Sequence, residues 1–363
     1  MNFINKRSYK DIGLFQITED NIIYVVSNSN RSNLYEIRGN DFFKIFESGD
    51  KILGTYKEKD SLWFITPKGT FEYQFNKTIK KIDNLWFQQI IEIPNYLFIK
   101  ADKNDQDCFC IYDIQNKEII WEIAYGSTTY LATKTNLFLA LSGKSVIRCY
   151  SYTSTNTIWE YDISEIGRYI PLLEETKSSG KISKIIGTYQ NQLIVLLKGG
   201  KFISLDINTG HLLWEKHTID INNTSQDIDY GFSDPTFPFY DKEKGEIYIL
   251  QGDSFIFFDL KSGLASYEWT SNDPKEERSI FVRNSGLYKD KIHFTARLEN
   301  SATYDVIGIF DITQRKIIWQ YKFGLDKYNN ILQTQMNDTH FYALDGENNL
   351  YVFEKEINNQ IYD

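Results

Sequence analysis

The stretch FISLDINTGHLLW, residues 202–214, contains the features that decide the fold. Apolar and polar residues alternate before the turn, which indicates a strand with one apolar and one polar face. Asp206 opens a tight turn, where its carboxylate can accept hydrogen bonds from backbone N–H groups two or three residues further on. Gly210 closes the turn, where glycine adopts a positive φ at little cost. Trp214 then provides a large apolar surface on a second strand.

The same unit recurs along the chain. Eight copies align on the Asp206 position, at Glu36, Gln74, Asp113, Ser151, Asp206, Asp259, Asp311 and Glu354. An aromatic residue stands eight positions later in the five middle copies, at Trp121, Trp159, Trp214, Tyr267 and Trp319. Gly210 has a counterpart in Gly263, whereas Lys117 and Arg315 replace it in two other copies. Regular recurrence at this length predicts a repeat architecture with one continuous core.

Each copy is preceded by an apolar strand with a tight polar turn and by a further short strand, so each repeat reads as a four-stranded antiparallel unit. The sequence therefore predicts an all-β fold, a single β-propeller domain over residues 1–363. Eight copies favour eight blades, and seven remain the alternative if the first or last copy completes a shared blade. The segment 3–9 could supply an outer strand beside residues 351–353 and so close the ring.

The pattern Asp206-x-x-x-Gly210-x-x-x-Trp214 resembles the repeat of the quinoprotein-like (PQQ-like) β-propellers. Asp113 with Trp121, Asp311 with Trp319, and Asp259 with Gly263 match parts of it. The resemblance implies that the tryptophans dock between neighbouring blades. Enzymes of that family use a quinone, calcium and, in one branch, adjacent cysteines. This chain has no adjacent cysteine pair, so the resemblance carries no catalytic residue across and implies no cofactor.

Composition limits the partners. The formal net charge of −9 disfavours nucleic acid and anionic membranes and permits a basic partner. The sequence contains no run of 18 apolar residues, the length that a membrane-spanning helix needs. The first residues lack the apolar core of a signal peptide. The three cysteines, Cys108, Cys110 and Cys149, fit a reducing compartment and a structural role. The sequence thus predicts a cytoplasmic, bacterial, monomeric protein.

Three consecutive blade-to-blade connections are long, at residues 162–181, 218–236 and 270–277, and in a propeller they emerge on one face. Long connections without regular structure are often functional. The middle connection mixes acidic and aromatic residues, and the candidate contacts for a protein partner are Asp227, Asp229, Tyr230, Phe232 and Asp234. Asp227 and Asp229 do not form a calcium loop, because the third spaced ligand, the glycine and the distant glutamate are missing. We therefore expect no metal there.

Two hypotheses follow. The first is a non-enzymatic, WD40-like or quinoprotein-like propeller that binds another protein, as a scaffold, a regulator or an immunity-type partner, through the face with the long connections. The second is a quinone- or metal-dependent enzyme with its site in the central channel. The dispersed histidines and the absence of a Gly-x-Ser-x-Gly motif give the enzyme hypothesis no catalytic residue.

Overall fold

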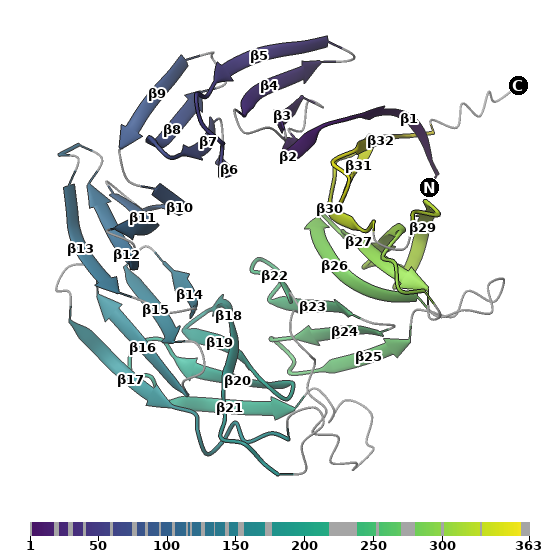
Figure 1. The fold of residues 1–363 in the computed structure, drawn as a ribbon. Coiled ribbons are helices and arrows are strands. Elements are labelled where there is room, and N and C mark those ends of the chain that lie inside the picture. Colours follow the sequence, from purple (N-terminus) through teal and green to yellow (C-terminus); the bar gives the residue numbers. More distant parts are fainter. Residues whose placement is uncertain are drawn as a thin grey trace, which may run out of the picture. The chain divides into compact units, whose positions relative to one another are not determined.

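The computed structural model describes residues 2–17, 22–27, 32–38, 41–58, 61–74, 78–83, 86–93, 96–103, 106–113, 115–116, 118–124, 128–133, 135–141, 145–151, 156–170, 176–217, 238–251, 254–269, 280–298, 301–326 and 329–356. Within these residues every regular element is a β-strand, and 32 strands form eight four-stranded sheets, here called blades (Figure 1). The chain groups into two compact units. One comprises Met1–Trp86, Leu250–Phe255 and Trp269–Asp363, and the other Phe87–Ile249 and Ile256–Glu268.

The first unit contains blades 1, 2, 7 and 8. Blade 1 is β2 (Ile12–Ile17), β3 (Ile23–Ser27), β4 (Asn33–Arg38) and β5 (Asp41–Glu47). Blade 2 is β6 (Gly54–Glu58), β7 (Ser61–Thr66), β8 (Gly69–Gln74) and β9 (Thr78–Asp83). Blade 7 is β26 (Ile280–Tyr288), β27 (Lys291–Leu298), β28 (Val306–Asp311) and β29 (Lys316–Lys322). Blade 8 is β30 (Ile331–Met336), β31 (His340–Asp345), β32 (Leu350–Lys355) and β1 (Phe3–Tyr9).

The second unit contains blades 3, 4 and 5 and much of blade 6. Blade 3 is β10 (Trp86–Ile93), β11 (Tyr96–Lys103), β12 (Gln106–Asp113) and β13 (Glu118–Ala124). Blade 4 is β14 (Thr128–Ala132), β15 (Asn136–Leu141), β16 (Val146–Ser151) and β17 (Thr157–Asp162). Blade 5 is β18 (Ile182–Tyr189), β19 (Gln192–Leu197), β20 (Lys201–Asp206) and β21 (Leu212–His217). Blade 6 is β22 (Phe239–Asp241), β23 (Glu246–Gln251), β24 (Ser254–Asp259) and β25 (Ala265–Trp269).

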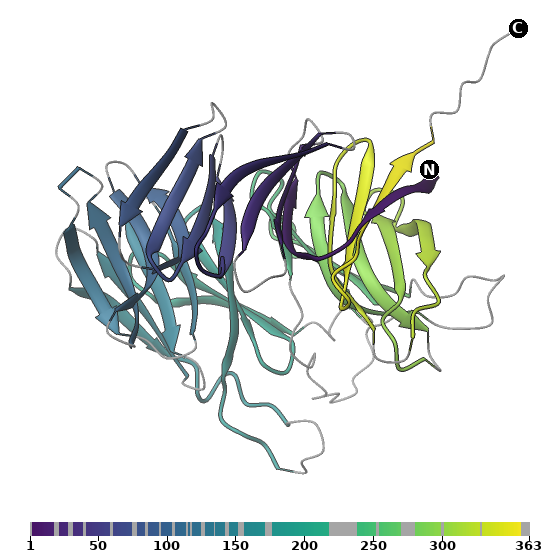
Figure 2. The ribbon, with the colours of Figure 1, turned by 45° about the horizontal axis from the view of Figure 1, so that its top comes forward.

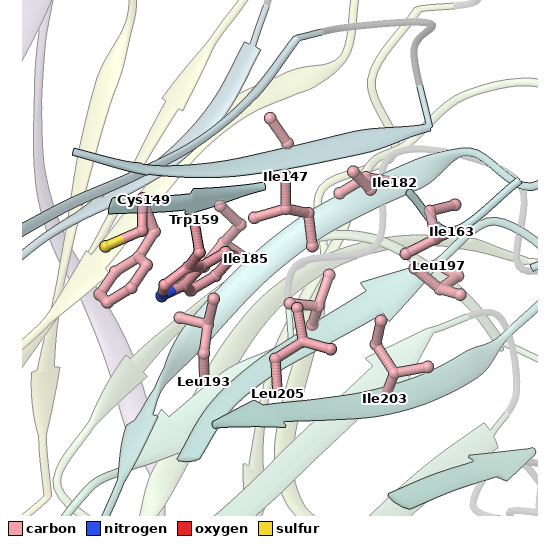
Figure 3. Close-up of a cluster of buried hydrophobic side chains, with 13 residues drawn as sticks. Ile147, Cys149, Trp159, Ile163, Ile182, Ile185, Leu193, Leu197, Ile203 and Leu205 are labelled. Atoms are coloured by element: carbon pink, nitrogen blue, oxygen red, sulfur yellow. The ribbon is translucent and has the colours of Figure 1, made fainter. Parts of the chain in front are cut away.

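Strand composition follows the position of each strand in its blade. The second strand of blade 5, β19, reads QLIVLL and is almost wholly buried, because neighbouring blades cover both of its faces. The fourth strand of blade 1, β5, is mostly exposed. Within each unit the core consists of apolar layers between adjacent blades, such as the cluster between blades 4 and 5 around Trp159, Ile185, Leu193 and Leu205 (Figure 3).

The first strand completes the last blade. β1 pairs antiparallel with β32, from Phe3 opposite Lys355 to Tyr9 opposite Leu350. It is therefore the fourth strand of blade 8, whose other three strands come from the end of the described chain (Figure 1). This pairing matches the expectation that residues 3–9 lie beside residues 351–353.

A bulge in the fourth strand recurs, and in five blades the residue after it is aromatic and lies toward the next blade. In blades 1, 3, 4, 5 and 7 the pairing between the third and fourth strands skips one residue. The residue directly after the skip is Phe46, Trp121, Trp159, Trp214 or Trp319. A bulge bends its strand and re-aims the following side chain, which explains why this position turns toward the next blade.

Candidate functional site

The connection between blades 4 and 5 is the long segment that the structure describes best. It leaves β17 at Ile163, whose N–H donates to the Ser145 carbonyl at 2.8 Å. Residues 163–170 and 176–181 then run as an arm with two limbs, joined by a β-bridge between Tyr169 and Ser178. Figure 2 shows this arm extending beyond the end of its sheet.

Two glycines allow the limbs of the arm to touch. A Cβ at Gly180 would lie 2.4 Å from the Ile163 carbonyl oxygen and 2.7 Å from the Cα of Gly167. The Gly180 N–H donates to the Ser164 carbonyl at 2.9 Å, and the Gly167 N–H donates to the Ile163 carbonyl at 2.9 Å. Any larger residue at position 180 must therefore separate the limbs.

The arm is seated on the turn between β19 and β20. Gly199 has φ +85°, and a Cβ there would meet Cβ of Tyr169 at 2.6 Å. Lys201 donates through Nζ to the Ile166 carbonyl at 2.8 Å, and the Lys198 N–H donates to the Lys181 carbonyl at 2.9 Å. The connection from the preceding blade and the second turn of blade 5 thus lie at the same end of this sheet, as a propeller requires.

The outer surface of the arm is polar. Arg168 and Glu165 form an ion pair at 2.8 Å with exposed side chains. Hydrogen bonds from the Ser164 backbone N–H and from Ser145 lower the pKa of Asp162 at the base of the arm. The Asp162 carboxylate therefore stays ionised near neutral pH, which suits electrostatic recognition at the rim of a protein interface.

A second polar group lies at the corresponding end of blade 7, in the other unit. The guanidinium carbon of Arg283 lies 4.9 Å from the ring centroid of Tyr304, and that of Arg297 lies 5.9 Å from it. Arg297 also donates to the Ser301 carbonyl at 2.8 Å. Asp305 is buried beside them and accepts from the Gly324 N–H at 3.1 Å. Cation–π contacts hold both arginines beside the Tyr304 ring, and arginine and tyrosine are among the residue types enriched in binding hot spots.

The candidate contact residues from the sequence, Asp227, Asp229, Tyr230, Phe232 and Asp234, lie outside the described residues. The same holds for the whole connection 270–277 and for all of 218–236. The structure therefore leaves their role as a prediction.

The repeat aspartates lie at the turns between third and fourth strands. Asp206 accepts from the N–H groups of Asn208 and Thr209, both at 2.9 Å. Asp113, Asp259 and Asp311 accept similar bonds from residues two or three positions on. Hydrogen bonds from Thr209 and Asn208 lower the pKa of Asp206. These carboxylates organise turns, which accounts for their place in the repeat.

The repeat tryptophans contact the next blade in different ways. Trp159 donates through Nε1 to the Ile207 carbonyl of blade 5 at 2.7 Å. Trp121 packs on Tyr150 at 5.9 Å and Trp319 on Phe341 at 5.1 Å, centroid to centroid. Trp214 is half-buried, packs on Phe258 at 5.7 Å, and donates to Gln192 within its own blade at 2.8 Å.

The packing of Trp159 explains why position 210 is a glycine. Gly210 has φ +72°, and a Cβ there would lie 2.6 Å from ring atoms of Trp159. Gly263 has φ +68° but nothing within 4 Å of that position, and Arg315 adopts φ 53° at the equivalent turn of blade 7. Turn conformation alone therefore does not demand glycine in every copy, whereas contact with Trp159 does at Gly210.

Sequence analysis missed several residues that the structure makes important. Gly167 and Gly180 gave no signal, because close backbone approach across a long connection leaves no pattern in spacing. Phe46 was missed because the hairpin from Leu34 to its partner Phe46 is two residues longer than that from Ser204 to Trp214, which places the aromatic ten positions beyond Glu36. Aligning on the bulge instead of on a fixed offset would have found it.

The described residues include cysteine and histidine side chains, which are residue types that can hold a metal or act in catalysis. Among the described residues no three or more His, Cys, Asp or Glu side chains come together as a possible metal site. Cys108 and Cys110 are buried thiols whose Sγ atoms lie 3.1 Å apart. His293 is buried against Thr334, with Nδ1 2.9 Å from Oγ1, and desolvation lowers its pKa to about 4. In the described part of the chain, no helix is long and apolar enough to cross a membrane.

Comparison with known proteins shows the fold. No protein-family model matches the sequence, and no curated protein matches it either. Among solved structures, the computationally designed Ika8 protein is similar with TM-score 0.57 and 8% identity, covering 95% of this chain and 96% of that one. Sqt1 from Saccharomyces cerevisiae has TM-score 0.57 and 10% identity, covering 98% of both chains. Hsv2 from Kluyveromyces lactis has TM-score 0.51 and 12% identity, covering 85% of this chain and 94% of that one. The chain is an all-β protein with the β-propeller fold.

Proposed function

We propose that this propeller is a protein-interaction module, a scaffold or regulatory partner, and that it binds through the face bearing the long blade-to-blade connections. The observation that carries the proposal is the arm formed by residues 163–170 and 176–181. It is fixed to blade 5 by backbone hydrogen bonds and by the contact of Tyr169 with Gly199, and it presents charged side chains outward. A protruding, anchored and polar segment provides contacts at little ordering cost.

The charge of the chain supports a basic partner. The formal net charge is −9, and the neighbouring connection 218–236 adds the candidate contacts Asp227, Asp229 and Asp234 with Tyr230 and Phe232. Acidic groups at a rim accelerate encounter with a basic surface, and aromatic residues at its centre slow dissociation. We place the protein in the cytoplasm, where its free cysteines Cys108, Cys110 and Cys149 remain reduced.

The experiment compares partner capture by matched variants. Affinity purification with cross-linking from the native host identifies the partner of the wild-type chain, and binding kinetics with that partner follow. Gly180→Val should separate the limbs of the arm and weaken binding. Gly49→Val is the control, because Gly49 is exposed, has no positive φ, and a Cβ there would meet only the terminal nitrogen of the Lys68 side chain. Replacement of residues 218–235 by a short Gly/Ser linker should abolish binding while the protein still folds, since loop-length entropy changes slowly.

Unchanged affinity in both the Gly180→Val variant and the linker variant would refute this binding face. Charge reversal at Asp227 and Asp229 should chiefly slow association, and Tyr230→Ala should speed dissociation. The opposite pattern would count against the assigned roles of these residues, even if the face itself were correct.

A further inference from the structure

A pocket of about 300 Å³ lies between the outer strands of blades 1 and 2, both in the first unit. Phe43, Ile45 and Ile79 line it with apolar side chains, and Arg38 and Lys44 contribute cations. The buried residues Glu36 and Tyr73 lie at its base. This volume stands at the low end of small-molecule sites, so it suits a single large side chain.

The repeat explains why this junction is hollow. At the junction of blades 4 and 5 the residue after the bulge is Trp159, whose indole packs with Leu205 and Leu212 of blade 5 and reaches the Ile207 carbonyl. Leu205 and Leu212 are paired across β20 and β21, as Tyr73 and Ile79 are paired across β8 and β9.

At the junction of blades 1 and 2 the residue after the bulge is Phe46. Its ring packs on Phe64 and Phe71, with centroids 4.9 and 5.3 Å away. Phenylalanine lacks the second ring and the N–H of an indole, so it does not extend as far as tryptophan. Tyr73 and Ile79, which correspond to the two leucines that pack with Trp159, therefore line an open pocket.

The base of the pocket contains a hydrogen-bond acceptor. Glu36 is 5% exposed, and its Oε1 accepts from Arg38 while its Oε2 accepts from the Tyr73 hydroxyl at 3.4 Å. Desolvation, followed by the charge of Glu36, raises the pKa of Tyr73, so the phenol stays a neutral donor. A carboxylate has about four acceptor positions, so Glu36 retains capacity for a further N–H donor.

The opening combines apolar surface and positive charge. Phe43 is 51% exposed and Ile79 is 39% exposed. The side chains of Arg38 and Lys44 are about half exposed, and the ion pair between Lys44 and Glu47 at 2.6 Å lies at the surface. Exposed ion pairs contribute little, so Lys44 can turn to an incoming carboxylate or aromatic face. Arg38 keeps its bond to the buried Glu36 through Nε and presents its remaining N–H groups to the opening.

We propose that this pocket receives an aromatic side chain, tryptophan by its size and its N–H donor, from a partner-protein segment in which acidic residues flank the aromatic. The aromatic ring fills the space between Phe43, Ile79 and Tyr73, the indole N–H donates to Glu36, and the flanking carboxylates meet Arg38 and Lys44. The site thereby completes in trans the packing that Trp159 provides within the chain at the junction of blades 4 and 5. This proposal does not rest on the arm formed by residues 163–170 and 176–181.

The test uses purified full-length protein and three blocked pentapeptides, Asp-Asp-Trp-Asp-Asp, Asp-Asp-Ala-Asp-Asp and Lys-Lys-Trp-Lys-Lys. The tryptophan carries a ¹⁵N-labelled indole, so NMR titration reports both affinity and hydrogen bonding of the N–H. A single buried side chain corresponds to a dissociation constant of about 1 mM. We expect saturable binding and a downfield indole shift for the acidic tryptophan peptide, and no binding of the alanine peptide. Equal binding of the lysine and acidic peptides would overturn the assigned partner chemistry.

Adjacent residues on β5 supply a matched pair of variants. Phe43→Ala removes a wall of the pocket, whereas Phe42→Ala removes a ring of similar exposure that contacts Tyr9 and Tyr35 instead. We expect Phe43→Ala to weaken peptide binding about tenfold, as loss of a central aromatic contact does, and Phe42→Ala to leave it unchanged. Lys44→Glu should weaken binding in a salt-dependent way. Absence of binding to the wild type at 5 mM peptide (about five times the expected dissociation constant), or equal loss in the two phenylalanine variants, would refute the pocket as a docking site.

Discussion

Trp159 and Trp319 occupy the same repeat position, yet the junctions that they fill are built differently. Trp159 lies on the turn of the next blade, against Gly210 and the Ile207 carbonyl, within an apolar cluster. Trp319 meets no such turn, because the fourth strand of blade 8 is β1. It packs instead on Phe3 of that strand at 5.1 Å and on Phe341 at 5.1 Å. The two junctions thus share a tryptophan at the same repeat position, but the residues that contact this tryptophan differ from one blade to the next.

The largest expected effect is loss of either indole. Trp159→Ala and Trp319→Ala should each lower the free energy of unfolding by about 3–5 kcal/mol, as truncation of large buried aromatics does. Urea denaturation measures the change, and Trp214→Ala serves as the comparison, because Trp214 is only half-buried. If Trp214→Ala lowered the free energy of unfolding as much as Trp159→Ala, the distinction between a buried and a half-buried indole would be wrong.

The second effect is a pH dependence of the free energy of unfolding, which we expect from the junction of blades 7 and 8. The junction of blades 7 and 8 contains the buried His293, whose pKa of about 4 lies below the value near 6.5 of an unfolded histidine. The unfolded chain binds the proton first as pH falls. The stability contribution is therefore complete above pH 6.5 and is lost as pH falls toward 4, by about 1.4 kcal/mol per pH unit.

His293→Gln provides the control for this pH dependence. Urea denaturation between pH 7 and pH 4 should show a shallower decline in the variant than in the wild-type chain, because glutamine does not titrate. An identical slope would mean that His293 is not desolvated as its burial against Thr334 and Phe341 implies.

The sequence predicted the strands, their turns and the repeat, because each depends on local chemistry. The alternation in FISLD, the carboxylate of Asp206 and the permissive backbone of Gly210 act within a few residues. The offset of the aromatic residue depends on hairpin length, so a fixed offset of eight missed Phe46. The contacts that each aromatic makes depend on the neighbouring repeat. The arm was predictable only as a long connection. Its closure at Gly167 and Gly180 depends on two backbones meeting, which no pattern of residue types encodes.

The third effect compares two glycines of one motif. Gly210→Ala and Gly263→Ala should each cost about 1–2 kcal/mol, because both have positive φ. Gly210→Ala should cost about 1–3 kcal/mol more, since the new Cβ would overlap Trp159. Urea midpoints of the two variants measure the difference. Introducing Gly210→Ala into Trp159→Ala should remove the extra cost, and persistence of that cost would show that contact with Trp159 is not its source.

The smallest effect in stability concerns Phe46, which holds the indole position at the junction of blades 1 and 2. Phe46→Trp adds a second ring beside the pocket lined by Tyr73 and Ile79, so the junction should come to resemble the one that Trp159 fills. The added apolar contact should raise the free energy of unfolding by up to about 1 kcal/mol, because the ring enters existing space. The same ring should compete with the acidic tryptophan peptide and prevent its binding.

Stabilisation with peptide binding intact would place the new indole outside the pocket, and destabilisation would show that Phe64 and Phe71 already enclose Phe46 too closely for a larger ring. Phe46→Leu, which shortens the side chain, is the matched variant: it should lower stability and leave the pocket open to the peptide.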